Sequence, residues 1–528
     1  MIFENLLLLL LCGISLQFLR SYIFLPLLYI RKSGSRGCGA VPIEPTRWPL
    51  GIDKVRAGLQ ADRDQLTPEL VTKRFESMGR YTFRISILGS TNLITAEPAN
   101  VQAILASQFT DFAMGAARRT NLKLVLGRSI FAVDGKAWHS AREVVRPIFA
   151  RENIADFSLL ENHVQKMFAC IEGSVISLGD WTLPVSMGTL FPCLTLDSAT
   201  ELFLGQSSHS LEAWQDVGGT NHSTGFQEAF EKLLALLSIR MRLQGLYWLY
   251  GNRELKECMA VIHSFVDDAI LSADNAKLDG IAISKKHDFL HMLRSTCADR
   301  AEVREQVLGL LAAGRDTTAS LMSWVFYCLA RDERVWKKLR AEVIETFGLY
   351  SSDTETTLQN ITFQKLKSCR YLQHVLNETL RLHSIVAFNS RMAVRDTTLP
   401  TGGGPDGTQP VFVPAGTEVN FSSHVMHRRK DLWGDDADMF VPERWETVRP
   451  RWSYVPFNGG PRLCIGQQFA LTEAGYVVVR LLQRFDDMEG LDVDRTRDYT
   501  HFTVVASPGT PNHAHGSVRC RFRVCSGI

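Results

Sequence analysis

Apolar residues recur at helical spacing along most of the chain. The longest such stretch runs from about Ala301 to Arg331, and Asp299 with Glu302 three residues later forms the capping-box pattern of a helix start. A helix of this length spans about 45 Å, enough to cross a whole domain. A second helix is predicted from Ile465 to Phe485.

Strand-like alternation is confined to short regions. Residues 82–97 read TFRISIL, then GSTN, then LITAE, which predicts a hairpin. Residues 411–421 repeat this pattern around Pro414-Ala415-Gly416. The predicted class is therefore mainly α with small β-sheets (α+β), in a single large domain.

The first thirty residues follow a different pattern. Leu6 to Ile30 is almost wholly apolar and carries one formal charge, Arg20. As a helix it would be about 37 Å long, enough to span a bilayer. A cleaved signal peptide is the alternative, but Glu4 precedes the apolar run and no small-residue cleavage site follows it. The expected division is a membrane anchor over 1–30, a proline-containing hinge over 31–50 and one large domain over 51–528.

Composition and charge exclude several classes of protein. The chain has 58 basic and 56 acidic residues, so no overall field attracts nucleic acid. Its eleven cysteines are scattered without a C-x-x-C pair, in a chain too large to need a disulfide framework. Basic residues follow the apolar N-terminal run, so the positive-inside rule leaves the main domain in the cytosol.

One cysteine lies in the unusual stretch FNGGPRLCIG. A thiolate is a soft ligand for iron, glycines let the backbone lie against a flat group, and the start of a helix stabilises a thiolate. A single cysteine is ordinarily an inert thiol. The spacing of Phe457, Gly460, Arg462, Cys464 and Gly466 favours a ligand site instead.

Two further clusters are ambiguous when taken alone. Gly314, Asp316 and Thr317 interrupt an apolar helical run, which fits either a local kink or a site where a flat ligand approaches beside a proton relay. Glu378 and Arg381 are three residues apart on a helix, as in many exposed pairs, but they would form a larger cluster with the arginine of FVPERW, Arg444.

Together these motifs resemble the haem-thiolate monooxygenases, the cytochromes P450, and they occur in that family's order. The resemblance covers nearly the whole chain and implies the cytochrome P450 fold behind an N-terminal membrane helix. It implies that Cys464 is the axial ligand of haem iron and that Asp316 and Thr317 relay protons. It further implies haem-binding roles for Trp138, Arg142, Arg391, Arg462, Phe457 and Gly314, and a structural role for Glu378, Arg381 and Arg444.

The resemblance also implies cofactors and partners. These are haem b with its iron, O2 as co-substrate, and electrons from NADPH through a separate NADPH-cytochrome P450 reductase. The expected enzyme is monomeric in the endoplasmic reticulum membrane, contacts membrane lipid, faces the cytosol and binds a lipophilic small molecule but no nucleic acid.

Within the family, the chain most resembles fungal enzymes that oxidise n-alkanes and fatty acids. The resemblance is carried by LLAAGRDTTASLMSW and by the long segment after FNGGPRLCIG. The expected substrate is a long-chain alkane, fatty acid, or fatty-acyl or polyketide chain. Several of the expected pocket residues would be ordinary core residues in the alternative interpretation. By resemblance, the pocket residues are Phe131, Ile385, Val386, Ala387, Phe388, Val504 and Val505.

The chain departs from its family at several places. Ser384 replaces a usual proline, and Arg118, Arg119 and Arg128 either bind a substrate carboxylate or lie on the surface. These departures leave an alternative function open. The enzyme would then be a tailoring oxidase of a secondary-metabolite pathway that acts on a non-fatty-acid lipophilic intermediate. A haem-thiolate isomerase or dehydratase needs no acid–alcohol pair, so Asp316 and Thr317 disfavour it.

Overall fold

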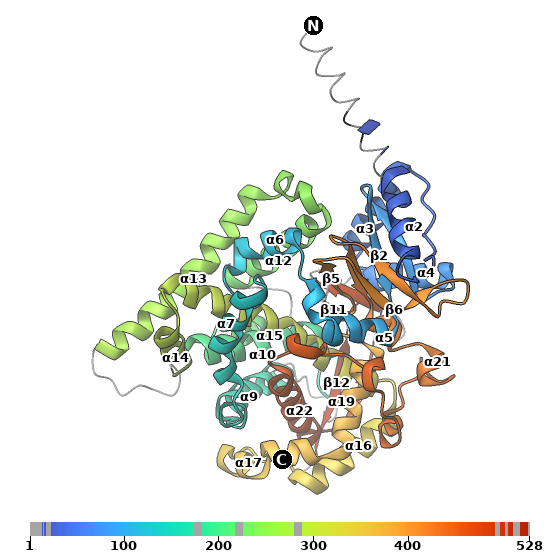
Figure 1. Cartoon of the computed structure of the whole chain (residues 1–528). Helices are drawn as coiled ribbons and strands as arrows, with labels where there is room; N and C mark the ends of the chain where they lie inside the picture. Colours follow the sequence, from blue (N-terminus) through green and yellow to red (C-terminus); the bar gives the residue numbers. More distant parts are fainter. Residues whose placement is uncertain are drawn as a thin grey trace. The chain divides into compact units, whose positions relative to one another are not determined.

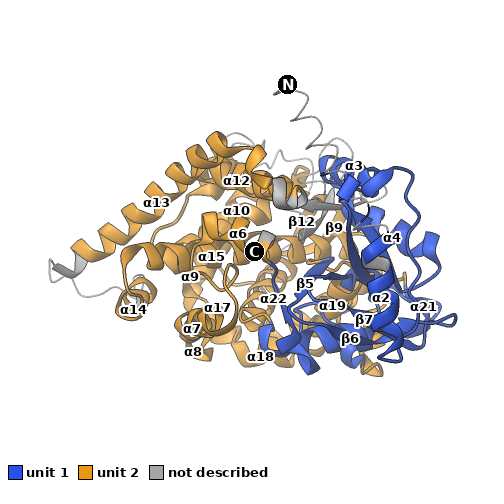
Figure 2. Ribbon diagram, turned by 45° about the horizontal axis from the view of Figure 1, so that its top comes forward, with its two compact units in different colours: residues 1–115, 387–437, 450–463 blue, residues 116–386, 438–449, 464–528 orange. Residues whose placement is uncertain are grey.

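The structure is a computed structural model that describes residues 13, 15–16, 19, 23–173, 181–216, 225–278, 288–491, 497–501, 505–509 and 518–525. The chain forms two compact units (Figure 2). Unit 1 comprises residues 1–115, 387–437 and 450–463, and unit 2 comprises residues 116–386, 438–449 and 464–528.

Unit 1 contains a five-stranded sheet in the order β1-β2-β8-β5-β3 and a two-stranded sheet of β6 and β7. Its strands are β1 (Thr82–Ile87), β2 (Ser90–Thr95), β3 (Phe112–Ala113), β5 (Asn389–Ala393), β6 (Thr397–Gly403), β7 (Gln409–Val413) and β8 (Glu418–Phe421). Its helices are α2 (Leu25–Gly34), η2 (Pro49–Gly51), α3 (Ile52–Arg63), α4 (Thr67–Met78), α5 (Pro98–Gln102), η3 (Ala103–Ser107), η4 (Phe109–Asp111), α20 (Ser423–Met426), α21 (Lys430–Trp433), η9 (Arg451–Ser453) and η10 (Gly460–Arg462).

The predicted hairpin at 82–97 is present as β1 and β2. Phe83 pairs with Ile94, and Phe83 and Ile85 point into the core of unit 1, while Arg84 between them is more exposed. Leu88 and Gly89 connect the strands with φ of 49° and 77°, the left-handed conformation of a tight hairpin turn.

The second predicted hairpin, at 411–421, is wrong. Both strands form, but β7 pairs with β6, whereas β8 pairs with β2 and β5. Local alternation predicted the strands correctly. Their partners were not predictable from it, because Thr95 meets Phe421 across more than three hundred residues of chain.

Unit 2 is mostly helical (Figure 1). Its helices are α6 (Ala116–Leu126), α7 (Gly135–Val145), η5 (Arg146–Phe149), α8 (Arg151–Ile154), α9 (Ser158–Glu172), α10 (Met187–Leu204), α11 (Ser210–Asp216), α12 (Gly225–Arg242), η6 (Gln244–Leu249), α13 (Asn252–Leu278), α14 (Asp288–Thr296), α15 (Arg300–Leu329), α16 (Glu333–Phe347), α17 (Thr354–Asn360), α18 (Phe363–Ser368), α19 (Arg370–Leu382), η8 (Pro442–Glu446) and α22 (Gln467–Arg484). Its strands β4 (Val185–Ser186), β12 (Arg519–Val524) and β9 (Phe485–Gly490) form one small sheet, and β10 (Arg497–His501) and β11 (Val505–Gly509) form another.

The long predicted helix is α15, which begins and ends within two residues of the expected bounds. Asp299 caps it by accepting a hydrogen bond from the N–H of Glu302 at 2.8 Å, and the Glu302 carboxylate accepts from the N–H of Ala298 at 2.9 Å. α10 lies along α15. The second predicted helix is α22, which begins at Gln467.

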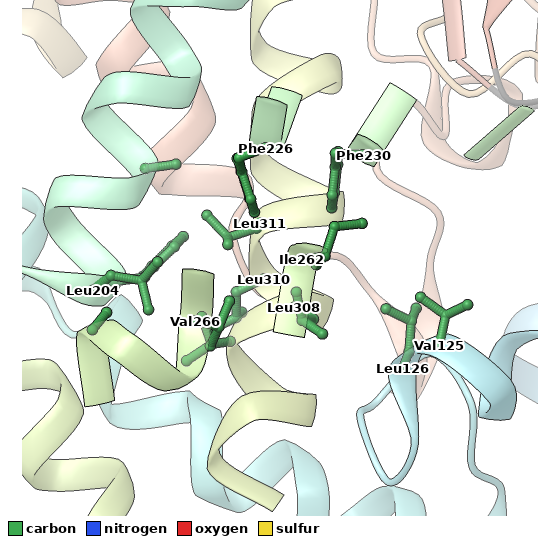
Figure 3. Close-up of a cluster of buried hydrophobic side chains, with 14 of the residues drawn as sticks. Val125, Leu126, Leu204, Phe226, Phe230, Ile262, Val266, Leu308, Leu310 and Leu311 are labelled. Carbon is green, nitrogen blue, oxygen red and sulfur yellow. The ribbon is translucent and has the colours of Figure 1, made fainter. Parts of the chain in front are cut away.

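Leucine, valine and phenylalanine side chains from several helices form the main core of unit 2. Figure 3 shows Phe226 and Phe230 of α12 with Leu310 and Leu311 of α15 in this core. α6, α10 and α13 supply the other walls. This packing holds the middle of α15 in place from several sides.

The prediction of a mainly α fold with small sheets is confirmed. Most of the predicted anchor, residues 1–30, lies outside the described residues. In the part of the chain that the structure describes, no helix is long and apolar enough to cross a membrane.

Candidate active site

The middle of α15 contains a partly exposed stretch between two buried ones. Leu308 to Leu311 and most of Thr318 to Leu329 are buried, whereas the residues between them include several that are partly exposed. A Cβ atom added at Gly314 would meet no other atom within 4 Å. The backbone at Gly314 therefore borders open space, as a flat ligand lying against the helix requires.

Asp316 and Thr317 lie on this partly exposed stretch. Thr317 Oγ1 donates a hydrogen bond to the carbonyl of Ala313, one turn earlier, at 2.7 Å. The hydroxyl oxygen keeps lone pairs that accept further hydrogen bonds. The Asp316 side chain is 19% exposed, and its Oδ1 lies 3.5 Å from Nε of Arg315.

Cys464 lies three residues before the start of α22. Among the ten cysteines in the described residues, it alone is exposed. Desolvation by the surrounding chain raises the pKa of its thiol, whereas the N–H of Gly466 and the guanidinium of Arg142 act in the opposite direction. A cation and a backbone donor beside the sulfur are surroundings that would stabilise a metal-binding thiolate.

Trp138 and Arg142 lie one turn apart on α7, in the same unit as Cys464. Trp138 is buried, and the guanidinium carbon of Arg142 lies 5.7 Å from the centre of its ring. Burial lowers the pKa of Arg142, and Cys464 raises it. The structure therefore brings Trp138, Arg142 and Cys464 into one region of unit 2.

Arg391, Phe457 and Arg462 belong to unit 1. Arg391 is buried on β5, where its side chain donates to Asn389 Oδ1 at 3.1 Å and to the carbonyl of Ser390 at 2.7 Å. Gly460 has a φ of 65°, and a Cβ there would lie 1.9 Å from the carbonyl oxygen of Leu105. Only glycine fits this loop position.

Glu378, Arg381 and Arg444 lie together in unit 2. Arg381 donates to both carboxylate oxygens of Glu378, at 2.9 and 2.8 Å, and Arg444 Nε lies 3.4 Å from Glu378 Oε1. The N–H of Val441 and the indole of Trp445 also donate to Glu378, each at 3.0 Å. The cluster is fully buried at its centre and joins α19 to η8.

The expected pocket residues are also divided between the two units. In unit 2, Phe131 packs against the main core and Ile385 is buried, while Val386 is partly exposed. In unit 1, Ala387 is fully buried, and its carbonyl accepts hydrogen bonds from Ser422 and Ser423, so it is a core residue there. Phe388 is partly exposed, Val504 lies outside the described residues, and Val505 begins β11.

The loop between α6 and α7 is tied to α15 at two points. Arg128 binds Glu305 at 2.9 Å and Asp299 at 2.8 Å. A Cβ at Gly127 would lie 1.9 Å from the Glu305 side chain, and one at Gly309 would lie 2.9 Å from Cβ of Ser129. The segment that leads to Phe131 is therefore held tightly against the helix.

A model of the cytochrome P450 family matches residues 45–510. The chain belongs to the cytochrome P450 family. It is 62% identical to cytochrome P450 monooxygenase alt2 of Alternaria solani, over 96% of this chain and 97% of that one. It is 44% identical to cytochrome P450 monooxygenase g430 of a Fusarium species, over 88% and 82%. It is 38% identical to cytochrome P450 52A12 of Debaryomyces hansenii, over 89% and 90%. The protein is therefore a cytochrome P450 monooxygenase.

Membership in the cytochrome P450 family implies a haem held through a thiolate, and the residues of unit 2 fit that group. Cys464 supplies the sulfur, Arg142 supplies a cation beside it, and no neighbouring side chain covers the backbone of α15 at Gly314.

Two buried charged groups of this cytochrome P450 were missed from the sequence. Arg315, inside the AGRDTT motif, pairs with Glu231 of α12 at 2.5 Å. Glu473 of α22 accepts a hydrogen bond from Ser198 of α10 at 3.0 Å. An arginine within an apolar helical run is a usable signal, because a buried cation needs a partner. The positions of Glu231 and Ser198 carry no comparable signal.

Proposed function

We propose that this cytochrome P450 is a tailoring monooxygenase of a secondary-metabolite pathway. Its substrate in this proposal is a lipophilic intermediate other than a fatty acid. The identity of 62% with alt2, against 38% with 52A12, supports a substrate outside the range of the 52 series. This replaces an alkane or fatty acid as the preferred expectation.

The arginines of unit 2 support the same choice. A fatty acid presents a carboxylate that needs a cationic partner in an apolar pocket. Arg128 already binds Asp299 and Glu305, and Arg119 lies 3.6 Å from Asp134. At either arginine, a substrate carboxylate would have to share the cation with a carboxylate that is already beside it.

The proposed haem ligand is Cys464, with Trp138 and Arg142 beside it. A haem iron bound through a thiolate supplies oxygen activation and insertion of one oxygen atom into a C–H bond. Cys464 would hold the iron as a thiolate, and the N–H of Gly466 and the charge of Arg142 would stabilise that ionised form. Gly314 would leave room for the flat group against α15.

Asp316 and Thr317 are proposed to move protons on this face of α15. The hydroxyl of Thr317 is anchored to the carbonyl of Ala313, so its oxygen has a defined direction. Asp316, partly exposed, would exchange protons with solvent and pass them inward. This pair favours a monooxygenase over an isomerase or dehydratase.

Other parts of the proposal rest on the family resemblance. They are haem-binding roles for Arg391, Arg462 and Phe457, a structural role for Glu378, Arg381 and Arg444, and electron supply from NADPH through a reductase. The pocket roles of Phe131, Ile385, Val386, Ala387, Phe388, Val504 and Val505 are also proposals, as are the endoplasmic reticulum location and the division into 1–30, 31–50 and 51–528.

The first test is the carbon monoxide difference spectrum of the reduced protein, with Cys464→Ala and Cys464→Ser beside it. A Soret band typical of thiolate ligation that both variants lose supports Cys464 as the ligand. The protein with reductase is then offered dodecane, dodecanoic acid and neutral reduced polyketide chains, with products detected by mass spectrometry. Oxidation of the polyketide chains supports the proposal, and preferred oxidation of dodecanoic acid or dodecane contradicts it.

A further inference from the structure

Arg128 ties the segment 127–131 to α15 through its side chain. Its Nε–H donates to Glu305 Oε2 at 2.9 Å, and its Nη2–H donates to Asp299 Oδ1 at 2.8 Å. Nη1 lies 3.7 Å from Glu302 Oε2. Glu305 is the more enclosed of the two close carboxylates, because its side chain is 23% exposed and that of Asp299 is 55% exposed.

Glu305 also binds the main chain of the segment. The same Oε2 atom accepts the N–H of Arg128 at 3.0 Å, and the side-chain amide of Gln306 donates to the carbonyl of Arg128 at 3.3 Å. The hydroxyl of Ser129 is buried and forms no hydrogen bond in the part of the chain that the structure describes. Glu305 therefore fixes both the side chain and the main chain at Arg128.

The segment packs against α15 on both sides of Arg128. Gly127 has a φ of 47°, and a Cβ atom there would lie 1.9 Å from Cδ of Glu305. A Cβ atom at Gly309 would lie 2.9 Å from Cβ of Ser129 and 3.6 Å from Cδ2 of Phe131. The carboxylate thus presses against one end of the segment, and the ring of Phe131 rests on α15 at the other end.

A turn of main chain joins Arg128 to Phe131. The N–H of Ser129 donates to the carbonyl of Leu126 at 2.8 Å, and the N–H of Ala132 donates to the carbonyl of Ser129 at 2.9 Å. These hydrogen bonds make the segment one compact unit. A displacement at Arg128 is therefore passed on to Phe131, three residues later.

Phe131 lies beside the partly exposed stretch of α15. Its ring is next to Gly309, which shares a helix face with Ala313 and Asp316, four and seven residues later. Phe131 is itself partly exposed and packs against the main core of unit 2. The ring lies about one turn before the partly exposed stretch, which begins at Ala312.

We propose that Glu305 is a positioning residue that determines substrate specificity. By binding Arg128, it holds the Phe131 ring as a fixed wall at the N-terminal end of the partly exposed stretch of α15. The inference rests on the proposed function, in which Phe131 borders the substrate and Cys464 holds haem iron. It places the control of the pocket wall on an ion pair outside the pocket.

Removal of the Glu305 carboxylate should move the segment without unfolding the protein. Arg128 would keep Asp299 at 2.8 Å and Glu302 at 3.7 Å, so the guanidinium keeps a counter-charge. Both of these carboxylates lie earlier on α15, and they would draw Arg128 away from the position that Glu305 sets. Alanine is a good helix former, so Glu305→Ala does not weaken α15 itself.

Azoles test the wall without turnover, because their ring nitrogen binds haem iron while their substituents contact the surrounding pocket. The haem-loaded protein is titrated with imidazole and with 4-phenylimidazole, and the absorption spectrum gives the ratio of the two dissociation constants. This ratio does not depend on how much of the protein is folded. The variants are Glu305→Ala, Phe131→Ala and their combination.

Arg304→Ala is the matched control. Arg304 precedes Glu305 on α15, its side chain is 24% exposed, and it binds Asp267 of α13 at 2.5 Å. Its loss therefore breaks an ion pair of similar burial that joins α15 to a different part of unit 2.

We expect Glu305→Ala and Phe131→Ala to change the ratio several-fold and in the same direction, since each removes the wall from its place. Arg304→Ala should leave the ratio near that of the wild type. Because Glu305 acts through Phe131, Glu305→Ala should change the ratio little once Phe131 has been replaced by alanine.

The outcomes separate this inference from the function on which it rests. If Phe131→Ala changes the ratio and Glu305→Ala does not, Glu305 does not position the ring. An equal effect of Glu305→Ala with and without the ring would show that Glu305 acts elsewhere, and a change as large in Arg304→Ala would show that any ion pair of α15 acts. If Phe131→Ala leaves the ratio unchanged, or neither azole shifts the spectrum of the wild type, the proposed pocket or haem site fails and the inference fails with it.

A second measurement tests the contact itself through the urea midpoint of unfolding. Gly127→Ala introduces the same left-handed strain in the wild type and in Glu305→Ala, but only the wild type has the carboxylate in the way. We expect Gly127→Ala to lower the midpoint more in the wild type than in the Glu305→Ala background. Equal decreases would show that the carboxylate does not press on the segment and would contradict the proposal.

Discussion

Arg381 and Arg315 are both buried arginines on helices of unit 2, but their partners differ. Arg381 shares Glu378 with Arg444, and Val441 and Trp445 complete the hydrogen bonds of that carboxylate. Among the described residues, Arg315 pairs with Glu231 and lies 3.5 Å from Asp316, and its Nε–H forms no hydrogen bond. A buried cluster whose hydrogen bonds are all formed holds one arrangement of its side chains. A cluster with an unused hydrogen-bond donor can rearrange so that this donor gains a partner.

Glu473 is a buried ionisable group of a third kind. It is buried, and among the described residues no arginine or lysine forms an ion pair with it. Burial raises its pKa to about 7, although the hydrogen bond from Ser198 acts in the opposite direction. This carboxyl group avoids an unpaired charge by keeping its proton.

The largest effect is expected where the satisfied cluster is broken. Glu378→Gln leaves Arg381 and Arg444 buried without their shared counter-charge, which should cost about 3–5 kcal/mol of unfolding free energy. Urea unfolding followed by circular dichroism measures it, with the exposed neighbour Glu446→Gln as control. Similar midpoints for both variants would mean that the cluster contributes no more than a surface charge.

The next effect is a pH dependence caused by Glu473. Between about pH 4.5 and 7 the folded protein holds a proton that the unfolded chain releases, so stability falls as pH rises through this window. Above it, ionised Glu473 costs up to about 3 kcal/mol, at about 1.4 kcal/mol for each pKa unit.

Glu473→Gln should remove this penalty. The urea midpoint of the variant should exceed that of the wild type at pH 8 and approach it at pH 5. Glu228→Gln, an exposed change of the same kind, controls for the rest of the titration. An equal loss of stability from pH 5 to pH 8 in the wild type and in Glu473→Gln would exclude this role for Glu473.

A smaller free-energy effect, confined to activity, is expected at Asp316. Asp316→Asn should lower the turnover number about a hundredfold, or about 2.7 kcal/mol, because an amide does not relay protons. The unfolding midpoint should change little, since Glu231 still pairs with Arg315. Product formation per haem gives the rate, and a rate within threefold of the wild type would contradict the relay.

The smallest effect is expected for an exposed arginine. Arg253 pairs with Glu257 at 2.9 Å on the surface of α13, and its side chain is 91% exposed. Water and salt screen such a pair, so Arg253→Gln should leave the urea midpoint unchanged within error. A decrease as large as that of Glu378→Gln would mean that burial is not what distinguishes these arginines.

The features that could be predicted from the sequence are those with local signals. The cap of α15, the β1–β2 hairpin and the run of motifs along the chain each depend on residues a few positions apart. The partners of β7 and β8 depend on strands elsewhere in the chain, and so their pairing was predicted wrongly.

The same limit applies to the candidate site. Asp316 and Thr317 were recognisable because they interrupt an apolar helix. Glu231 was not, because it lies 84 positions from Arg315 and resembles any other charge on an amphipathic helix. Arg128 was recognised as unusual, but its carboxylate partners on α15 became visible only in the folded chain.

The tight fit of residues 127–131 against α15 bears on how this enzyme would evolve. Gly127 and Gly309 each sit where a methyl group would collide with the opposite segment, so neither position tolerates a larger residue without rearrangement. Phe131, at the end of that segment, is not a glycine position, so this limit on side-chain size does not apply to it. On the proposed pocket role of Phe131, new substrate ranges would arise through replacement of its ring, while Gly127 and Gly309 would persist because they let the segment lie against α15.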